Sequence, residues 1–201
     1  MANTVDIHED YVARIVHIIE QATIEERAAG MVWYGAYGKA IRAYGESHGY
    51  TGEQSTALFA ALSPRARIDR NWRNFKIACE DGTPVRCLCL TGPHRAKVAR
   101  YLAGLSTQPE VCSGDKVTAF YANLTGNLDP VTIDRHAAAV CLGQSQARRG
   151  VSHKQYGDYA LAYQAAAKLL DIEPAQAQAI AWIVWRRLKG IHDGGGLNLI
   201  A

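Results

Sequence analysis

Lys116 and Asp134 are the residues of this chain whose types and spacing best fit chemistry. The lysine follows a glycine-containing turn, Ser113-Gly114, at the expected start of a helix, and the aspartate opens the next expected helix. A turn with free backbone N–H groups suits a phosphate. An amine and a carboxylate on neighbouring helices suit chemistry at a sugar carbon, where the amine attacks and the carboxylate stabilises developing positive charge. The pair is therefore a candidate site for cleavage at a sugar.

Each of these residues also has an ordinary structural interpretation. Aspartate is favoured at helix N-caps, so Asp134 has a capping role whether or not it is catalytic. Most lysines lie exposed on helix surfaces, which is the alternative for Lys116. His136 belongs to no pattern of histidines and acids that would ligate a metal, and we expect it to pack or hydrogen-bond locally. The residues predict no metal and no cofactor.

The elements that must position these residues are helices nearly throughout, because apolar residues recur at helical spacing. Thr51 and Gln54 form a capping-box pattern, and Pro64 ends the helix that they start. A short extended segment is expected at 85–90 and a loop at 104–109. We predict an all-α protein of eight to ten helices, with helices over 8–22, 24–49, 51–62, 68–79, 91–103, 113–124, 133–142, 153–170 and 174–188.

Composition indicates a soluble globular protein of 201 residues, with 48% hydrophobic and 20% charged residues. The net charge of +3 permits a nucleic-acid partner without requiring one. No apolar run is long enough for a membrane span, so no membrane partner is expected. The five cysteines, an odd number without a signal peptide, indicate a reducing cytoplasm. Cys87 and Cys89 are too close for the usual zinc pair, which favours buried or unpaired thiols.

The order of several motifs resembles the helix-hairpin-helix DNA glycosylases of the endonuclease III superfamily. Residues 111–114 stand where that family has its Leu-Pro-Gly-Val-Gly hairpin, and Asp115-Lys116 where it has Arg-Lys. Residues 133–136 stand at the family's Val-Asp-Thr-His, and the lysine-to-aspartate spacing needs no gap. Two upstream segments, 58–65 and 91–97, follow in the family's order. The resemblance covers roughly residues 55–143.

The resemblance implies a two-lobed helical bundle of the glycosylase type with a central cleft. The whole chain, 1–201, would form a single glycosylase-like unit. Its core would span 23–143, with the helix-hairpin-helix around 98–125. Helices in 1–22 and 144–190 would complete the other lobe, and 191–201 would be a loose tail.

The implied activity is that of a DNA glycosylase with possible lyase activity, acting in base excision on double-stranded DNA, as a monomer, in a bacterial or phage-infected cell. Asp134 would support cleavage of the N-glycosidic bond of a flipped, modified or damaged base, and Lys116 would be the nucleophile. The residues expected to contact DNA are Ser113, Gly114, Arg65, Arg67, Arg95, Lys97 and Arg135. A base pocket would use Trp33, Tyr34, Tyr37 and His136, although an aromatic run in a helix is more often core.

The sequence departs from the family at three points. Cys112 replaces the first hairpin glycine, Arg135 replaces the threonine after the aspartate, and no cysteine follows Cys141 to build an iron–sulfur cluster. Two other functions stay open. One is a base-hypermodification enzyme on the same scaffold, as in phage-type relatives, and the other is a non-catalytic DNA-binding module.

Overall fold

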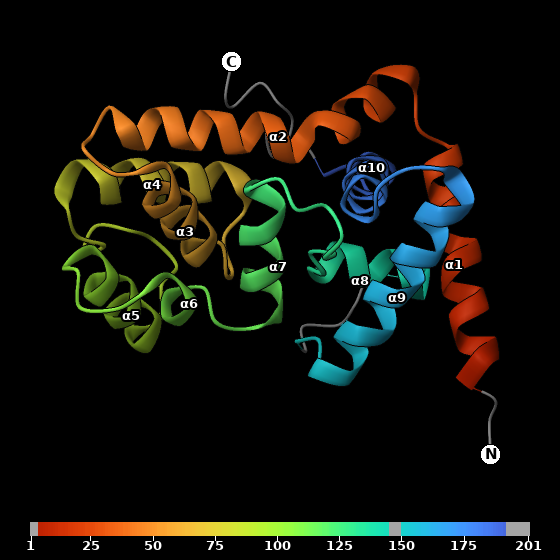
Figure 1. Ribbon diagram of the computed structural model, residues 1–201. Helices are drawn as coiled ribbons and strands as arrows, with labels where there is room; N and C mark the ends of the chain where they lie inside the picture. The colour runs from red at the N-terminus through yellow and green to blue at the C-terminus, as the bar shows by residue number, and fades with distance from the viewer. Residues whose placement is uncertain (1–3, 145–149, 192–201) are drawn as a thin grey trace. The chain divides into compact units, whose positions relative to one another are not determined.

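The computed structural model describes residues 4–144 and 150–191, and within these ranges every regular element is an α-helix (Figure 1). The predicted all-α class is confirmed. The helices are α1 (Thr4–Glu20), α2 (Ile24–Glu46), α3 (Gly52–Leu62), α4 (Ile68–Asp81), α5 (Gly92–Leu102), α6 (Gln108–Val111), α7 (Asp115–Leu124), α8 (Arg135–Leu142), α9 (His153–Leu170) and α10 (Pro174–Leu188).

The chain divides into two compact units, which are described separately. The described residues of the terminal unit are 4–34, 126–144 and 150–191, and it contains α1, α8, α9, α10 and the first part of α2. The described residues of the central unit are 35–125, and it contains the rest of α2 and α3–α7. Both boundaries fall inside the 23–143 segment that the resemblance assigns to one core. The tail expected at 191–201 lies outside the described residues from 192 onward.

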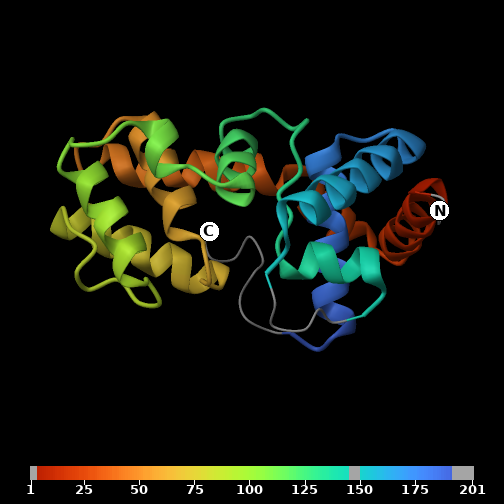
Figure 2. The same ribbon diagram turned by 90° about the horizontal axis from the view of Figure 1, so that it is seen from below.

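The terminal unit is built around α10, which packs against α1, α8 and α9 (Figures 1 and 2). Its core is rich in alanine, which lets the helices approach closely, and larger side chains such as Ile19, Tyr163 and Ile180 fill the space between them. Gly30 serves the same purpose on α2, because a Cβ there would lie 2.4 Å from the Ile180 side chain. Burial of these apolar faces is the main stabilising force of the unit.

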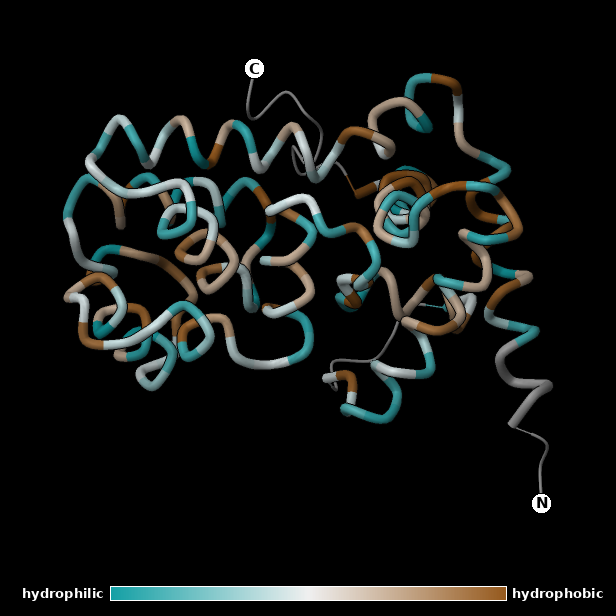
Figure 3. Tube along the Cα trace, viewed as in Figure 1, coloured by the Kyte–Doolittle hydropathy of each residue, from teal (hydrophilic) through white to brown (hydrophobic). Residues whose placement is uncertain are grey.

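The central unit is built around α3, whose residues 55–62 are all buried. Helices α4, α5, α6 and α7 pack against α3, and Phe59 makes ring contacts with Phe75 and Phe120. The capping box predicted at the start of α3 is confirmed, since Thr51 and Gln54 each bond the other's backbone N–H. Figure 3 shows hydrophobic and hydrophilic residues interspersed along the helices of this unit.

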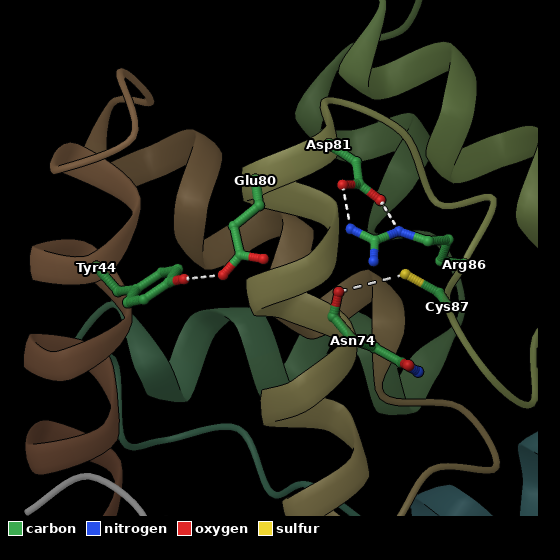
Figure 4. Close-up of polar contacts among 6 residues, drawn as sticks. All are labelled: Tyr44, Asn74, Glu80, Asp81, Arg86 and Cys87. Carbon is green, nitrogen blue, oxygen red and sulfur yellow. Dashed lines mark hydrogen bonds and ion pairs between the residues drawn. The ribbon is translucent and has the colours of Figure 1, made fainter.

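The segment 85–90 is not the extended piece that was expected, because side chains of the neighbouring helices satisfy its backbone. The Asn74 amide donates to the Leu88 carbonyl at 2.9 Å and accepts from the Leu88 N–H at 2.9 Å. The Cys87 thiol donates to the Asn74 carbonyl at 3.3 Å, and Arg86 forms a bidentate ion pair with Asp81 (Figure 4). The loop is therefore fixed without a partner strand.

The same close-up shows how α2 is tied to α4 within the central unit. The Tyr44 hydroxyl donates to Glu80 Oε1 at 2.7 Å (Figure 4). Gly38 on α2 approaches the end of α7, where an added Cβ would lie 2.3 Å from the Leu124 carbonyl oxygen. Gly30 and Gly38 thus allow close packing of α2 without interrupting the helix.

A short helix, α6, occupies part of the stretch 104–109 that was expected to be a loop. Thr107 caps it, and Glu110 bonds back to the Thr107 backbone N–H at 2.6 Å. This reciprocal cap starts a helical turn immediately before the hairpin. No helix in the described part of the chain is long and apolar enough to cross a membrane.

Candidate functional site

The turn between α6 and α7 in the central unit has a regular geometry despite Cys112. Cys112 has φ −91°, which any residue adopts, and it is the C-cap of α6. The positive φ of the turn falls on Gly114, at +100°, where glycine carries no steric cost. The Cys112 side chain is buried, and its thiol lies 3.6 Å from the Ala57 carbonyl oxygen. The cysteine therefore anchors the turn to α3 instead of straining it.

A pocket of about 230 Å³ opens beside this turn, inside the central unit. Its walls come from the end of α3, the loop before α4, the first turns of α5, and the turn that leads into α7. The residues that line it are Ala61, Pro64, Arg65, Thr91, His94, Lys97, Val111, Ser113 and Val117. Three of the predicted DNA-contacting residues, Arg65, Lys97 and Ser113, are thereby brought together.

Lys97 and Ser113 contact each other directly at this pocket. The Lys97 ammonium donates to Ser113 Oγ at 2.7 Å. Burial lowers the pKa of Lys97. His94, one turn earlier on α5, bonds the Ala61 carbonyl oxygen through Nε2 at 2.5 Å. Burial is also the main cause that lowers the pKa of His94, and the charges of Lys97 and Arg65 add to it.

The other predicted phosphate-binding arginines have different roles. Arg95 points to the 84–87 loop and donates to the carbonyl oxygens of Pro84, Val85 and Cys87, so its guanidinium serves the fold. Arg67 pairs with Asp69, with Nε 3.4 Å from Oδ1. Arg65, by contrast, lines the pocket; it is exposed and has φ +61°, a left-handed conformation that is rare for arginine.

Lys116 lies in the first turn of α7, next to the pocket-lining Val117. Its side chain is partly buried, and Nζ is 3.4 Å from the Ser63 carbonyl oxygen. Lys116 belongs to the central unit and Asp134 to the terminal unit. The pairing of the two therefore stays a prediction.

Asp134 is the N-cap of α8 in the terminal unit. Its Oδ1 accepts the backbone N–H groups of His136 and Ala137, both at 2.8 Å. Its Oδ2 accepts the indole N–H of Trp182, on α10, at 3.1 Å. A carboxylate oxygen has two acceptor positions, so with the donors of the described residues Oδ1 is saturated and Oδ2 has one position left for a further donor. The capping interpretation is confirmed. The cap uses Oδ1, so Oδ2 is the oxygen with room for a further hydrogen-bond donor.

Two further side chains fix the surroundings of this carboxylate. The Tyr156 hydroxyl, from α9, donates to the Val131 carbonyl at 2.7 Å and accepts the Ile133 N–H at 3.1 Å, which fixes the backbone just before Asp134. Arg186, one turn after Trp182 on α10, stacks its guanidinium 4.0 Å from the centre of the indole ring. Asp134 is thus held by three elements: α8, α9 and α10.

Aromatic residues gather around the same carboxylate. Trp182 contacts Trp33 with ring centroids 6.1 Å apart and His136 at 6.5 Å, both edge-to-face. Trp33 in turn contacts Tyr34 at 4.9 Å. Trp33 and Tyr34 are buried, at 6% and 4% exposure, as the core interpretation of this aromatic run predicts.

The remaining predicted residues lie elsewhere. Tyr37 belongs to the central unit, where it is fully buried and contacts Phe59. Arg135 is exposed in the terminal unit, and its Nε donates to His136 Nε2 at 3.3 Å.

Sequence reasoning missed Trp182 and Tyr156 as partners of Asp134. Trp182 and Arg186 are spaced as neighbours on one helix face, which was a readable signal for their stacking. Nothing in the sequence related either to Asp134, because that contact depends on how α10 packs against α8. Within the described residues, no group of three or more His, Cys, Asp or Glu side chains forms a potential metal site.

Comparison with known proteins adds a family but no activity. No curated protein and no solved structure matches the chain. The model of DUF7178, a family of unknown function, matches residues 2–189. Because this match extends over nearly the whole sequence, the chain belongs to the DUF7178 family.

Proposed function

We propose that this protein is a DNA glycosylase that cleaves the N-glycosidic bond of a flipped modified or damaged base. The observation that carries the proposal is the Asp134 carboxylate, fixed by two backbone N–H groups and one indole N–H with an acceptor position to spare. Glycosidic cleavage develops positive charge on the sugar, and a fixed carboxylate stabilises that charge and orients an attacking water.

The motif order shared with the helix-hairpin-helix glycosylases supports the same proposal. The central unit contributes a turn with a left-handed glycine, Gly114, and a pocket lined by Arg65 and Lys97. Cationic side chains and helix N-termini of this kind bind phosphates without reading base sequence. DNA contacts and base release would thus draw on different units of the chain.

The test is base release from a panel of duplexes that carry damaged, mismatched or modified bases, with free base measured by mass spectrometry. The wild-type chain is expected to release base from at least one duplex. The Asp134→Asn variant is expected to lose the activity, and Asp129→Asn is the matched control, because Asp129 is exposed in the same unit. If the wild-type chain released base from none of the duplexes, the result would count against a glycosylase and favour the DNA-binding module or the base-hypermodification enzyme.

Lys116 is the proposed nucleophile for an added lyase step. Its amine would attack the sugar C1′ as the base leaves, and the resulting Schiff base can be reduced to a stable amine. Borohydride trapping with wild-type protein and Lys116→Met tests this claim. An adduct that survives in Lys116→Met would assign the nucleophile to another amine. The lack of any adduct with the wild type would remove the lyase step and leave hydrolysis intact.

A non-catalytic DNA-binding module is the second candidate, and the capping role of Asp134 favours it, since a cap alone explains an aspartate at this position. This candidate predicts salt-dependent DNA binding that survives substitution of both Asp134 and Lys116. A base-hypermodification enzyme would instead alter the base without releasing it, so the same mass-spectrometric assay separates it from a glycosylase.

A further inference from the structure

The pocket of the central unit has a charge that none of its own residues balances. Arg65 and Lys97 line it, and no acidic side chain in the described part of the chain does so. His94 and the hydroxyl groups of Thr91 and Ser113 complete its polar lining. Two cationic side chains around one concavity attract an anion, and a partly desolvated cation is costly without a counter-charge.

Two helix N-termini add to this field. Helix α5 begins at the pocket wall after Thr91, and α7 begins after Gly114, beside Ser113. The N-cap residues themselves, Thr91 of α5 and Gly114 of α7, make no side-chain cap hydrogen bond, and the first turn of α7 carries one acidic residue, Asp115. Uncapped backbone N–H groups at a helix start are anion-binding groups, and both helices are long enough to carry a dipole.

The side-chain donors converge from three separate segments. The Lys97 ammonium has three N–H donors and uses one on Ser113 Oγ, at 2.7 Å. Because Ser113 Oγ accepts this bond, its own hydrogen can be donated to a third group. Arg65 presents its guanidinium from the loop before α4, in a left-handed conformation.

We infer that this pocket binds a phosphate monoester, either a small phosphate ester or the terminal phosphate of a DNA strand. A monoester carries a charge of about −1.5 to −2 at neutral pH and three free oxygens, which match two cations and donors from three segments. An internal phosphodiester carries one charge and two free oxygens, so it matches less well. The burial that lowers the Lys97 pKa agrees with an ammonium that lacks its counter-ion.

This inference deepens the phosphate contact that the proposed function assigns to the pocket, and it is tested separately because phosphate binding does not require that the chain release a base. The first experiment is an NMR titration of the full chain with inorganic phosphate, following the backbone amides of residues 113–117 and 94–97. The test variants are Lys97→Met, which keeps the apolar stem, and Arg65→Asn, which tolerates the left-handed conformation. The control is Lys39→Met, the same charge change on an exposed residue of this unit.

Saturable amide shifts in wild type and Lys39→Met are expected, with affinity at least about tenfold weaker in each test variant, as loss of one charge-assisted hydrogen bond implies. Circular dichroism of the variants checks that they fold. The lack of saturable shifts, or equal affinity in all four proteins, would overturn the site.

The second experiment identifies the source of the phosphate. Two DNA duplexes of one sequence, with a 5′-phosphate or a 5′-hydroxyl, are compared by fluorescence anisotropy. Tighter binding of the phosphorylated duplex that is lost in Lys97→Met assigns the pocket to a strand end. Equal binding of both duplexes, together with Lys97-dependent binding of inorganic phosphate, assigns it to a small phosphate ester.

Discussion

Substituting Asp134 with alanine or asparagine separates its capping role from the role proposed in catalysis. Alanine removes the acceptor of two backbone N–H bonds and of the Trp182 indole bond. Losing an N-cap costs about 0.5–2 kcal/mol, and an indole N–H left without its partner adds a comparable amount. We therefore expect Asp134→Ala to lower the free energy of unfolding by about 2 kcal/mol.

Asparagine keeps most of the cap. Its Oδ1 accepts both backbone N–H groups, but its Nδ2 is a donor and cannot accept the indole hydrogen. We expect Asp134→Asn to cost about 1 kcal/mol or less, since only the indole bond is lost. Activity should nevertheless fall in both variants by a factor of about 100 to 1,000, which is typical when one charge-stabilising group is removed.

The assay is urea unfolding followed by circular dichroism and by tryptophan fluorescence. Trp33, Trp182 and Trp185 belong to the terminal unit, so fluorescence reports mainly on the unit that contains Asp134. Equal destabilisation by alanine and asparagine would refute the capping account. Retention of activity in the stable Asp134→Asn variant would refute the catalytic account.

Three further predictions follow from burial and packing. Because the pKa of His94 is lowered in the folded protein, the unfolded chain binds this proton first as the pH falls, and the free energy of unfolding should decrease below about pH 6.5. Urea titrations between pH 7.5 and 5.5 should show a flatter pH profile for His94→Gln than for the wild type. An unchanged slope would contradict the burial of this imidazole. Burial raises the pKa of four cysteine thiols: to about 12 for Cys79 and Cys141, to about 11 for Cys87, and above its usual value for Cys112. The native protein should therefore have a single thiol that reacts fast with a disulfide reagent, the exposed Cys89, and Cys89→Ser should abolish the fast phase. Gly35→Ala should stabilise α2 by about 0.5–1 kcal/mol, because the added Cβ meets nothing within 4 Å. Gly38→Ala should destabilise the protein by about 1–3 kcal/mol, because its Cβ would lie 2.3 Å from the Leu124 carbonyl oxygen. Thermal unfolding that ranks the two variants in the opposite order would contradict this packing.

Sequence patterns predicted the helices well because helix formation depends on residues close together in the sequence. The cap of α3 and the spans of α9 and α10, 153–170 and 174–188, required only periodicity, capping residues and a proline. The stretch 85–90 was misjudged because its conformation depends on Asn74 and Arg95, which contact it only after the helices pack. The strand propensity of a short segment does not include tertiary contacts of this kind.

In the candidate site, too, the features that depend on neighbouring residues were predictable and those that depend on helix packing were not. The N-cap at Asp134 was predictable because capping is local, and the left-handed residue of the hairpin turn was a glycine. The Trp182 bond to Asp134 was not predictable, because it joins helices far apart in the sequence. The convergence of Arg65, Lys97 and Ser113 on one pocket likewise depends on how α3, α5 and α7 pack.

The most direct test of the central claim is the single-turnover rate of base release for wild type, Asp134→Asn and Asp129→Asn on one duplex that the wild type cleaves. A catalytic Asp134 predicts that Asp129→Asn matches wild type and that Asp134→Asn is slower by a factor of about 100 or more, with both variants folded. Base release by Asp134→Asn at the wild-type rate would contradict the assignment of this carboxylate to catalysis.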